Sequence, residues 1–181
     1  MNILMKNNKK YILCPSTCFS KDTIINVKEN NKIVKKKISE VKIDDNILTL
    51  FNGEKKYTKV KSLILCEGEG VFYEFKCMID DNIKSITVTN NHIMMVYNKD
   101  MSQLKFKTAD SILKEEDYFL TIDGLYQIKE INTFNWKGKY TISVDEGAII
   151  ANDILVTCLT KNDVNKQLSL NEMSKKFALK I

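Results

Sequence analysis

Cys18 and His92 are the residues whose types could carry out covalent chemistry together. A thiolate attacks carbonyl carbon atoms, and an imidazole nearby can take the proton and return it. His92 is the only histidine in the chain, which excludes every motif that needs two histidines, including the paired-histidine metal sites. Two simpler interpretations stay open at this point: Cys18 as a small core residue, and His92 as a polar residue at a strand end.

The five cysteines also allow a metal-binding interpretation. Cys14 and Cys18 have the spacing of the first half of a zinc knuckle, but Cys66, Cys77 and Cys158 do not supply the second half. An odd number of cysteines in a chain without a secretory signal argues against a disulfide framework. We therefore expect the cysteines to be buried thiols, ligands or reactive groups, and we expect no resident metal and no cofactor.

Composition and charge narrow the possible partners. The chain has 181 residues and a net charge of +5, but all its basic residues are lysines. Arginine is the preferred side chain for phosphates and guanine edges, so we expect no nucleic-acid partner. No apolar run is long enough to span a bilayer, and the N-terminus lacks the apolar region of a signal peptide. We expect a monomeric, cytoplasmic protein.

Two-residue alternation of apolar and polar residues dominates the chain and predicts an all-β domain. Turn residues that tolerate positive φ separate many of the segments, among them Asn30-Asn31, Asn52-Gly53, Asp123-Gly124 and Lys137-Gly138. The predicted strands are 23–27, 46–50, 57–65, 71–79, 85–89, 92–98, 103–107, 118–122, 125–131, 139–144 and 148–159.

Two features concern the arrangement of the elements. Residues 37–50 and 108–121 share a short helical turn, an acidic pair and an apolar strand, which indicates a pseudo-symmetric β fold. At the C-terminus, Ser169 and Glu172 have the spacing of a capping box, so residues 169–181 are predicted to form a short amphipathic helix.

Four motifs, taken in order, resemble those of a Hint domain, the Hedgehog/intein autoprocessing module. The stretch CFSKDTIINV (18–27) resembles the opening of that domain, where a cysteine follows the cleavage junction. KISEVKIDDNIL (37–48) resembles a family stretch that ends in Gly-Asp, with Asp44 in place of the glycine. VTNNH (88–92) resembles the Thr-x-x-His motif. YTISVDEGAIIANDILVTC (140–158) resembles the closing motif, with Thr141 where that motif has an acidic residue.

The resemblance implies a horseshoe-like, pseudo-two-fold, all-β Hint fold with a short C-terminal helix. Residues 1–17 would be an N-terminal leader, 18–160 the autoprocessing domain, and 161–181 a linker and the helix. It also implies a self-cleaving activity: Cys18 attacks the carbonyl of the preceding residue and converts the amide to a thioester by an N–S acyl shift. His92 would transfer the proton, and Thr89 would stabilise the tetrahedral oxyanion at the same junction.

The end of the closing motif determines how the thioester is resolved. Inteins splice through a terminal asparagine, but the matching pair here is Thr157-Cys158, so we expect no splicing. The aspartate that assists sterol transfer in Hedgehog domains is also missing, because its position falls at or next to Cys66. We therefore expect cleavage of the chain's own N-terminal segment, with water, a small nucleophile or Cys158 as the acyl acceptor. Cys158 is alternatively a disulfide partner of Cys18 or a buried small residue.

Two other classes of function remain as alternatives. One is a degenerate Hint-like β domain that only binds a protein partner, through the predicted tail helix and the lysine-rich strands. The other is a basic nucleic-acid binder, whose binding would depend strongly on salt.

Overall fold

The computed structural model describes residues 3–6, 9–12, 17–51, 53–79, 81–99 and 103–158. Within these ranges the chain forms β-strands and two 3₁₀ turns, so the all-β prediction is confirmed. The many β-branched and aromatic residues explain this, because they fit a pleated, half-buried surface. The predicted linker (161–168) and C-terminal helix (169–181) lie outside the described residues.

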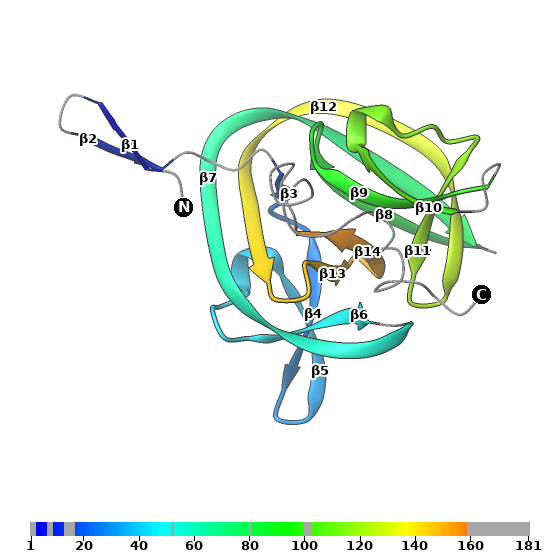
Figure 1. The fold of residues 1–181 in the computed structure, drawn as a ribbon, viewed down its shortest axis with the longest axis horizontal. Coiled ribbons are helices and arrows are strands. Elements are labelled where there is room, and N and C mark those ends of the chain that lie inside the picture. The colour runs from blue at the N-terminus through cyan, green and yellow to red at the C-terminus, as the bar shows by residue number, and fades with distance from the viewer. Residues whose placement is uncertain are drawn as a thin grey trace.

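A long, curved two-stranded ribbon forms the frame of the molecule. β7 (Glu54–Ile79) and β12 (Gly124–Val144) pair antiparallel over most of their length. Figure 1 shows them side by side as a band that curves around the central strands. The sequence predicted two shorter strands in place of each of these, 57–65 and 71–79 for β7 and 125–131 and 139–144 for β12. Both strands instead run on without a break, because each supplies the other's ladder of hydrogen bonds.

Lys137-Gly138 is a bulge within β12 and not a hairpin turn, which corrects the sequence prediction. The register with β7 shifts between Lys137 and Lys139, and Gly138 has a φ of 82°. Glycine tolerates this backbone conformation at no steric cost, and an isolated glycine in a strand often marks a bulge. The bulge lies three residues before Thr141, so it helps to set which way that part of the strand faces.

Two similar series of elements lead into the two long strands. The first is β4 (Ile24–Glu29), β5 (Lys32–Lys37), η1 (Ile38–Glu40) and β6 (Asn46–Phe51). The second is β9 (Ile93–Asn98), β10 (Gln103–Thr108), η2 (Ala109–Ser111) and β11 (Asp117–Thr121). η1 precedes η2 by 71 residues, the separation that also divides Cys18 from Thr89. The predicted pseudo-symmetry is present in the structure.

The remaining strands lie between the two series. β3 (Phe19–Ser20) pairs with β8 (Asn82–Thr89) and with β12. The predicted segment 148–159 is divided by a turn at Asn152-Asp153 into β13 (Ala148–Ala151) and β14 (Ile154–Thr157). Apart from the hairpin of β1 (Ile3–Lys6) and β2 (Lys9–Ile12), the described strands belong to one sheet.

The core has two parts. The larger cluster includes Phe19, Phe75 and Phe119, and the smaller one includes Leu50 and Met95. All eight residues of β13 and β14 are buried, which explains why both strands are almost entirely apolar. In the part of the chain that the structure describes, the two 3₁₀ turns are far too short to cross a membrane.

Candidate functional site

The Thr17–Cys18 peptide bond is buried in the body of the domain. Thr17 is 2% exposed and Cys18 is fully buried. The next residue, Phe19, fixes the position of the bond, because its ring lies in the larger core cluster while its backbone pairs with Val88 of β8 and Tyr140 of β12. The bond therefore enters the fold between the ends of two strands that come from different parts of the sequence.

The small turn after Cys18 explains the opening motif. Thr23 donates its backbone N–H to the carbonyl of Ser20 at 3.2 Å, and the two hydroxyl groups lie 3.3 Å apart. Asp22 is in the turn and pairs with Lys37, which lowers the pKa of its carboxyl group. This pair is solvent-exposed, so Asp22 contributes to the turn and does not reach the buried junction.

Thr89, the last residue of β8, contacts the nitrogen side of the junction. Its hydroxyl accepts a hydrogen bond from the amide N–H of Cys18 at 3.0 Å. Its own backbone N–H donates to the carbonyl of Cys18 at 2.9 Å. The motif predicts that Thr89 stabilises the oxyanion. In the structure its contacts are with the amide nitrogen and the carbonyl of Cys18, so it lies at the nitrogen that an acyl shift would release.

Thr141 on β12 contacts both the nucleophile and the oxygen side of the junction. Its hydroxyl donates to the carbonyl oxygen of Thr17 at 3.0 Å and lies 3.1 Å from the sulfur of Cys18. Thr141 itself is 8% exposed. In the sequence, Thr141 stands out only because it replaces an acidic residue of the closing motif. That position in the motif is the signal that it belongs to the site.

Burial dominates the electrostatics of the Cys18 thiol. Removal from water raises the pKa of Cys18, while the hydrogen bond with Thr141 and the positive charge of Lys139 act in the opposite direction. The net effect is upward, so the thiol keeps its proton near neutral pH. Chemistry at this sulfur therefore needs a nearby group that accepts the proton as the sulfur reacts.

His92 is fully buried, between Phe19 near the start of the domain and Thr157 near its end. Its Nε2 lies 3.0 Å from the carbonyl oxygen of Thr157, and its ring packs edge-on against Phe19 with centroids 4.6 Å apart. A carbonyl oxygen only accepts, so Nε2 carries the proton of the neutral ring. The buried Nδ1 then carries the lone pair, and it has no hydrogen-bond partner in the part of the chain that the structure describes.

Burial also sets the protonation state of His92. It lowers the pKa of the ring to about 4, although the backbone groups of Thr157 and Cys18 act to raise it. The backbone of Cys18 influences the pKa of His92 because the ring lies near it, next to the ring of Phe19. His92 is therefore a neutral imidazole near pH 7 that is close to both Cys18 and the Thr157–Cys158 bond.

Cys158 lies directly after β14, at the end of the closing motif. Its amide N–H donates to the carbonyl of Gly147 at 2.8 Å, and burial raises the pKa of its thiol strongly. Cys18 and Cys158 are both free thiols, so no disulfide joins them in this structure. A thiol with such a high pKa is a poor nucleophile.

The other cysteines differ from one another. Cys77 is a free, buried thiol whose pKa is raised to about 11 by burial, and its sulfur donates to the carbonyl of Lys84. Cys66 is disulfide-bonded, so the expectation of a buried thiol, ligand or reactive group is wrong for this residue. A disulfide depends on which Cα atoms the fold brings within about 6 Å, and a count of cysteines does not reveal that.

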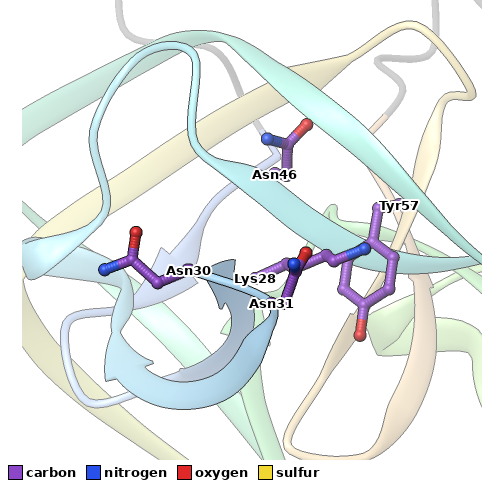
Figure 2. Close-up of a pocket in the computed structure, with 5 residues that line it drawn as sticks. All are labelled: Lys28, Asn30, Asn31, Asn46 and Tyr57. Atoms are coloured by element: carbon purple, nitrogen blue, oxygen red, sulfur yellow. The ribbon is translucent and has the colours of Figure 1, made fainter.

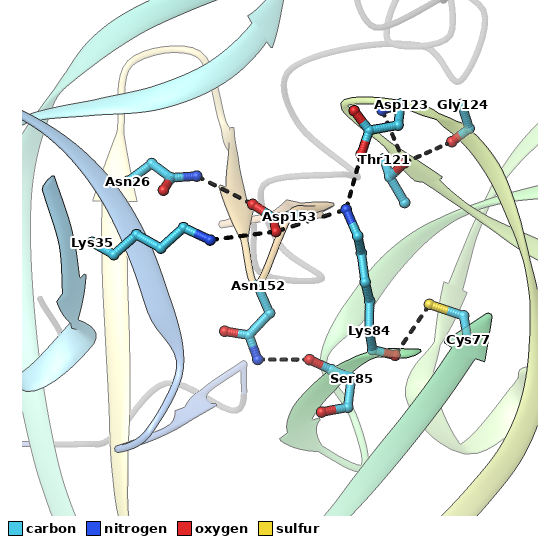
Figure 3. Close-up of polar contacts among 10 residues, drawn as sticks. All are labelled: Asn26, Lys35, Cys77, Lys84, Ser85, Thr121, Asp123, Gly124, Asn152 and Asp153. Atoms are coloured by element: carbon cyan, nitrogen blue, oxygen red, sulfur yellow. Dashed lines mark hydrogen bonds and ion pairs between the residues drawn. The ribbon is translucent and has the colours of Figure 1, made fainter. Parts of the chain in front are cut away.

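The turn at Asn152-Asp153 holds β14 beside His92. The Asn152 side chain accepts from the backbone N–H of Ile24 and donates to the carbonyl of Ser85, both at 2.6 Å. In Figure 3, Lys35 and Lys84 approach the Asp153 carboxylate from opposite sides, each at 3.7 Å. The turn thus connects β4 and β8 to the strand that ends at Thr157. The sequence alone does not reveal this role of Asn152.

A pocket of about 370 Å³ lies elsewhere on the molecule. Lys28, Asn30, Asn31, Asn46 and Tyr57 line it, as Figure 2 shows, and none of them contacts the Thr17–Cys18 junction in the hydrogen bonds described above. The Lys28 ammonium lies 5.2 Å from the centre of the Tyr57 ring. Among the residues that the structure describes, no group of three or more His, Cys, Asp or Glu side chains is placed to hold a metal ion.

The solved structures that this chain resembles include several inteins. A DnaB intein from Synechocystis sp. PCC 6803 superposes with a TM-score of 0.62 at 19% identity, covering 78% of this chain and 98% of the intein. An intein from a hyperthermophile gives a TM-score of 0.67 at 14% identity, with 78% and 99% coverage. The TvoVMA intein gives 0.64 at 14% identity, with 78% and 97% coverage. At these identities the likeness establishes the fold.

The sequence itself matches a family description. No curated protein matches the chain. The family model of the Hint module, however, matches residues 10–175, which is most of the sequence. That match, together with the intein-like fold and the order of the four motifs, shows that this chain belongs to the Hint family of autoprocessing domains.

Proposed function

We propose that this Hint domain cleaves its own chain between Thr17 and Cys18 through an N–S acyl shift. Cys18 is the nucleophile, residues 1–17 are the substrate segment, and residues 18–160 form the processing domain. Water or a small external nucleophile then resolves the thioester. The reaction takes place once per molecule, because the nucleophile belongs to the chain that is cut.

The arrangement of groups around one peptide bond is the observation that carries this proposal. A hydroxyl group of β12 binds both the attacking sulfur and the carbonyl oxygen of Thr17, and Thr89 binds the nitrogen that must leave. Hydrogen-bond donors fixed in advance at a developing oxyanion are the largest single contribution in many acyl transfers. The burial of the bond strengthens these contacts, because no water competes for them.

His92 is proposed as the group that holds a proton between the attack of sulfur and the departure of nitrogen. Among the described residues its Nδ1 has no hydrogen-bond partner, and its ring lies near the backbone of Cys18 and packs against Phe19. A neutral imidazole can accept a proton and return it within one reaction. The hydrogen bond from Nε2 to the carbonyl of Thr157 fixes the orientation of the ring and leaves Nδ1 as the nitrogen without a proton.

We propose cleavage without splicing. Cys158 occupies the position at which an intein would cyclise an asparagine. Transfer of the acyl group to Cys158 is disfavoured, because burial raises the pKa of that thiol and the thiolate is the reactive form. An external nucleophile is therefore the acceptor that we favour.

The test uses the full chain with a reporter fused before residue 1. Hydroxylamine attacks thioesters, so it should cut the chain after Thr17. Because Cys66 is disulfide-bonded, the products are separated under reducing conditions after the hydroxylamine has been removed, and mass spectrometry should then find the reporter with residues 1–17 ending at Thr17. Cys18→Ala should abolish the release. Cys77→Ala is the matched control, because Cys77 is also a free, buried thiol but contacts Lys84. A wild-type fusion that stays intact in hydroxylamine would refute the proposal and favour a domain that only binds a partner.

A further inference from the structure

Resting on the proposed function, we propose that Thr141 is a catalytic residue whose hydroxyl passes the thiol proton of Cys18 to the carbonyl oxygen of Thr17. The hydroxyl lies 3.1 Å from the sulfur and 3.0 Å from that oxygen. All three residues are buried, at 8% exposure or less. One side chain thus connects the attacking atom to the atom that must accept negative charge.

The directions of these hydrogen bonds are set by the number of protons. A hydroxyl group has one proton, and a carbonyl oxygen has none to donate. The proton of Thr141 therefore points to Thr17, and the thiol of Cys18 must be the donor in the contact between the sulfur and Thr141. The result is a continuous chain of donors, S–H to O–H to O=C, that leads from the nucleophile to its target.

The burial of the site makes such a chain useful. Ionisation of the thiol is costly here, because burial raises the pKa of Cys18. The titratable groups near the thiol among the described residues are Lys139, whose charge lowers that pKa, and the ring of His92, which is neutral near pH 7. A proton that moves through Thr141 as the sulfur attacks avoids a separate thiolate.

The attack can be written with a complete balance. The sulfur of Cys18 forms a bond to the carbonyl carbon of Thr17, and the π electron pair moves to the oxygen. That oxygen takes the hydroxyl proton of Thr141, and the Thr141 oxygen takes the proton from sulfur. The product is a neutral tetrahedral carbon that carries sulfur, nitrogen and a hydroxyl group.

The collapse of this species releases the nitrogen and leaves the thioester. The C–N bond breaks and its electron pair goes to the nitrogen, which takes up one proton. The hydroxyl on the carbon gives up one proton and becomes the thioester carbonyl. No proton is gained or lost overall, and Thr141 ends with its own hydroxyl restored.

A threonine differs chemically from the acidic residue that the closing motif has at this position. An ionised carboxylate accepts protons but has none to donate to a carbonyl oxygen. A threonine hydroxyl does both at once and carries no charge at any accessible pH. Because this chain has a threonine at this position, we expect the rate of the acyl shift to be nearly independent of pH below the pKa of the Cys18 thiol.

The experiment measures hydroxylamine-induced cleavage of the full-length reporter fusion. The hydroxylamine concentration is raised until the rate no longer depends on it, over roughly pH 6 to 9, a range that brackets an ordinary thiol pKa. Thr141→Val removes the hydroxyl with little change of shape and should slow cleavage by about 10²-fold or more. Thr141→Ser should restore most of the rate. The rate of Thr141→Val should rise with pH, because its sulfur must ionise first, whereas the wild-type rate stays flat.

Thr49→Val is the matched control, because Thr49 is also a buried threonine whose hydroxyl donates to a carbonyl, that of Ala148, at 2.7 Å. It should lower the melting temperature about as much as Thr141→Val and leave the rate unchanged. A Thr141→Val fusion that is cleaved at the wild-type rate with the wild-type pH profile overturns this inference alone, provided that Cys18→Ala still blocks cleavage. A wild-type fusion that is never cleaved overturns the proposed function together with this inference.

Discussion

At the level of single residues, three side chains divide the work around one peptide bond. Thr89 binds the nitrogen, Thr141 binds the oxygen and the sulfur, and His92 lies near the backbone of Cys18. Cys18, Thr89 and His92 were candidates from the sequence, because their types and order form recognisable motifs. The contacts of Thr141 were not predictable in this way, because its place in the closing motif marks a departure from an acidic residue but does not show which atoms the hydroxyl contacts.

The buried imidazole should make the fold sensitive to acid. The pKa of His92 is about 4 in the folded chain and near 6.5 when exposed, so the unfolded state binds more protons between these values. The free energy of unfolding therefore rises with pH through this window, and about 3 kcal/mol of stability is lost as pH falls from 6.5 to 4. Urea unfolding of the Cys18→Ala chain across this range measures the slope.

His92→Gln in the same Cys18→Ala background is the control for that measurement. Glutamine does not titrate, so the slope between pH 4 and 6.5 should largely disappear, even if the variant is less stable overall. Asp22 and Glu130 have carboxyl groups with lowered pKa, but both are solvent-exposed, and their stabilising effect is lost toward the acidic end of this window and below it, in His92→Gln as in the parent. An unchanged slope in His92→Gln would show that the ring is not held neutral by burial.

At the level of elements, the hairpin of β13 and β14 determines where the closing motif ends. Its turn residues Asn152 and Asp153 have φ of 49° and 65°, a conformation that asparagine and aspartate tolerate better than most residues. The sequence indicated strand structure through 148–159 but not this turn, because Asn-Asp is a weaker turn signal than Asn-Gly. The contacts of Asn152 with Ile24 and Ser85 come from distant strands and leave no local signal.

Asn152→Ala should be more destabilising than the same change at Asn30. Both residues come first in a two-residue turn and have positive φ, 49° and 46°, so both substitutions cost the same backbone strain of about 1–2 kcal/mol. Asn152 additionally loses two hydrogen bonds, worth about 1 kcal/mol each. Denaturant unfolding of the two variants measures the difference, and equal losses of stability would contradict the bracing role assigned to Asn152.

At the level of the whole molecule, pseudo-symmetry brings the chemical groups together. Cys18 and Thr89 stand 71 residues apart, as do η1 and η2, and each of the two binds the backbone of the other. The repeat was visible in the sequence at residues 37–50 and 108–121. The curved band of β7 and β12 passes around β3, as Figure 1 shows, and β3 directly follows the junction, so both halves must be complete for the site to form.

Removal of residues 161–181 separates the processing function from a binding function. All the groups assigned to the chemistry lie between Thr17 and Thr157, so hydroxylamine-induced cleavage of the shortened reporter fusion should proceed at the full-length rate. Loss of cleavage with an unchanged melting temperature would show that the tail takes part in the reaction. The family match continues to residue 175, which makes this deletion informative.

The sequence by itself determined the class of fold, most strand positions, the pseudo-repeat and the order of the motifs. These properties depend on the alternation of apolar and polar residues and on turn residues among sequence neighbours, so they can be predicted from the sequence alone. The tertiary structure alone decided that β7 and β12 are continuous, that Thr89 binds nitrogen, and that Thr141 binds oxygen and sulfur. Thr141 is 123 residues from Cys18, and contacts over such a separation form only when strand pairing has fixed the register.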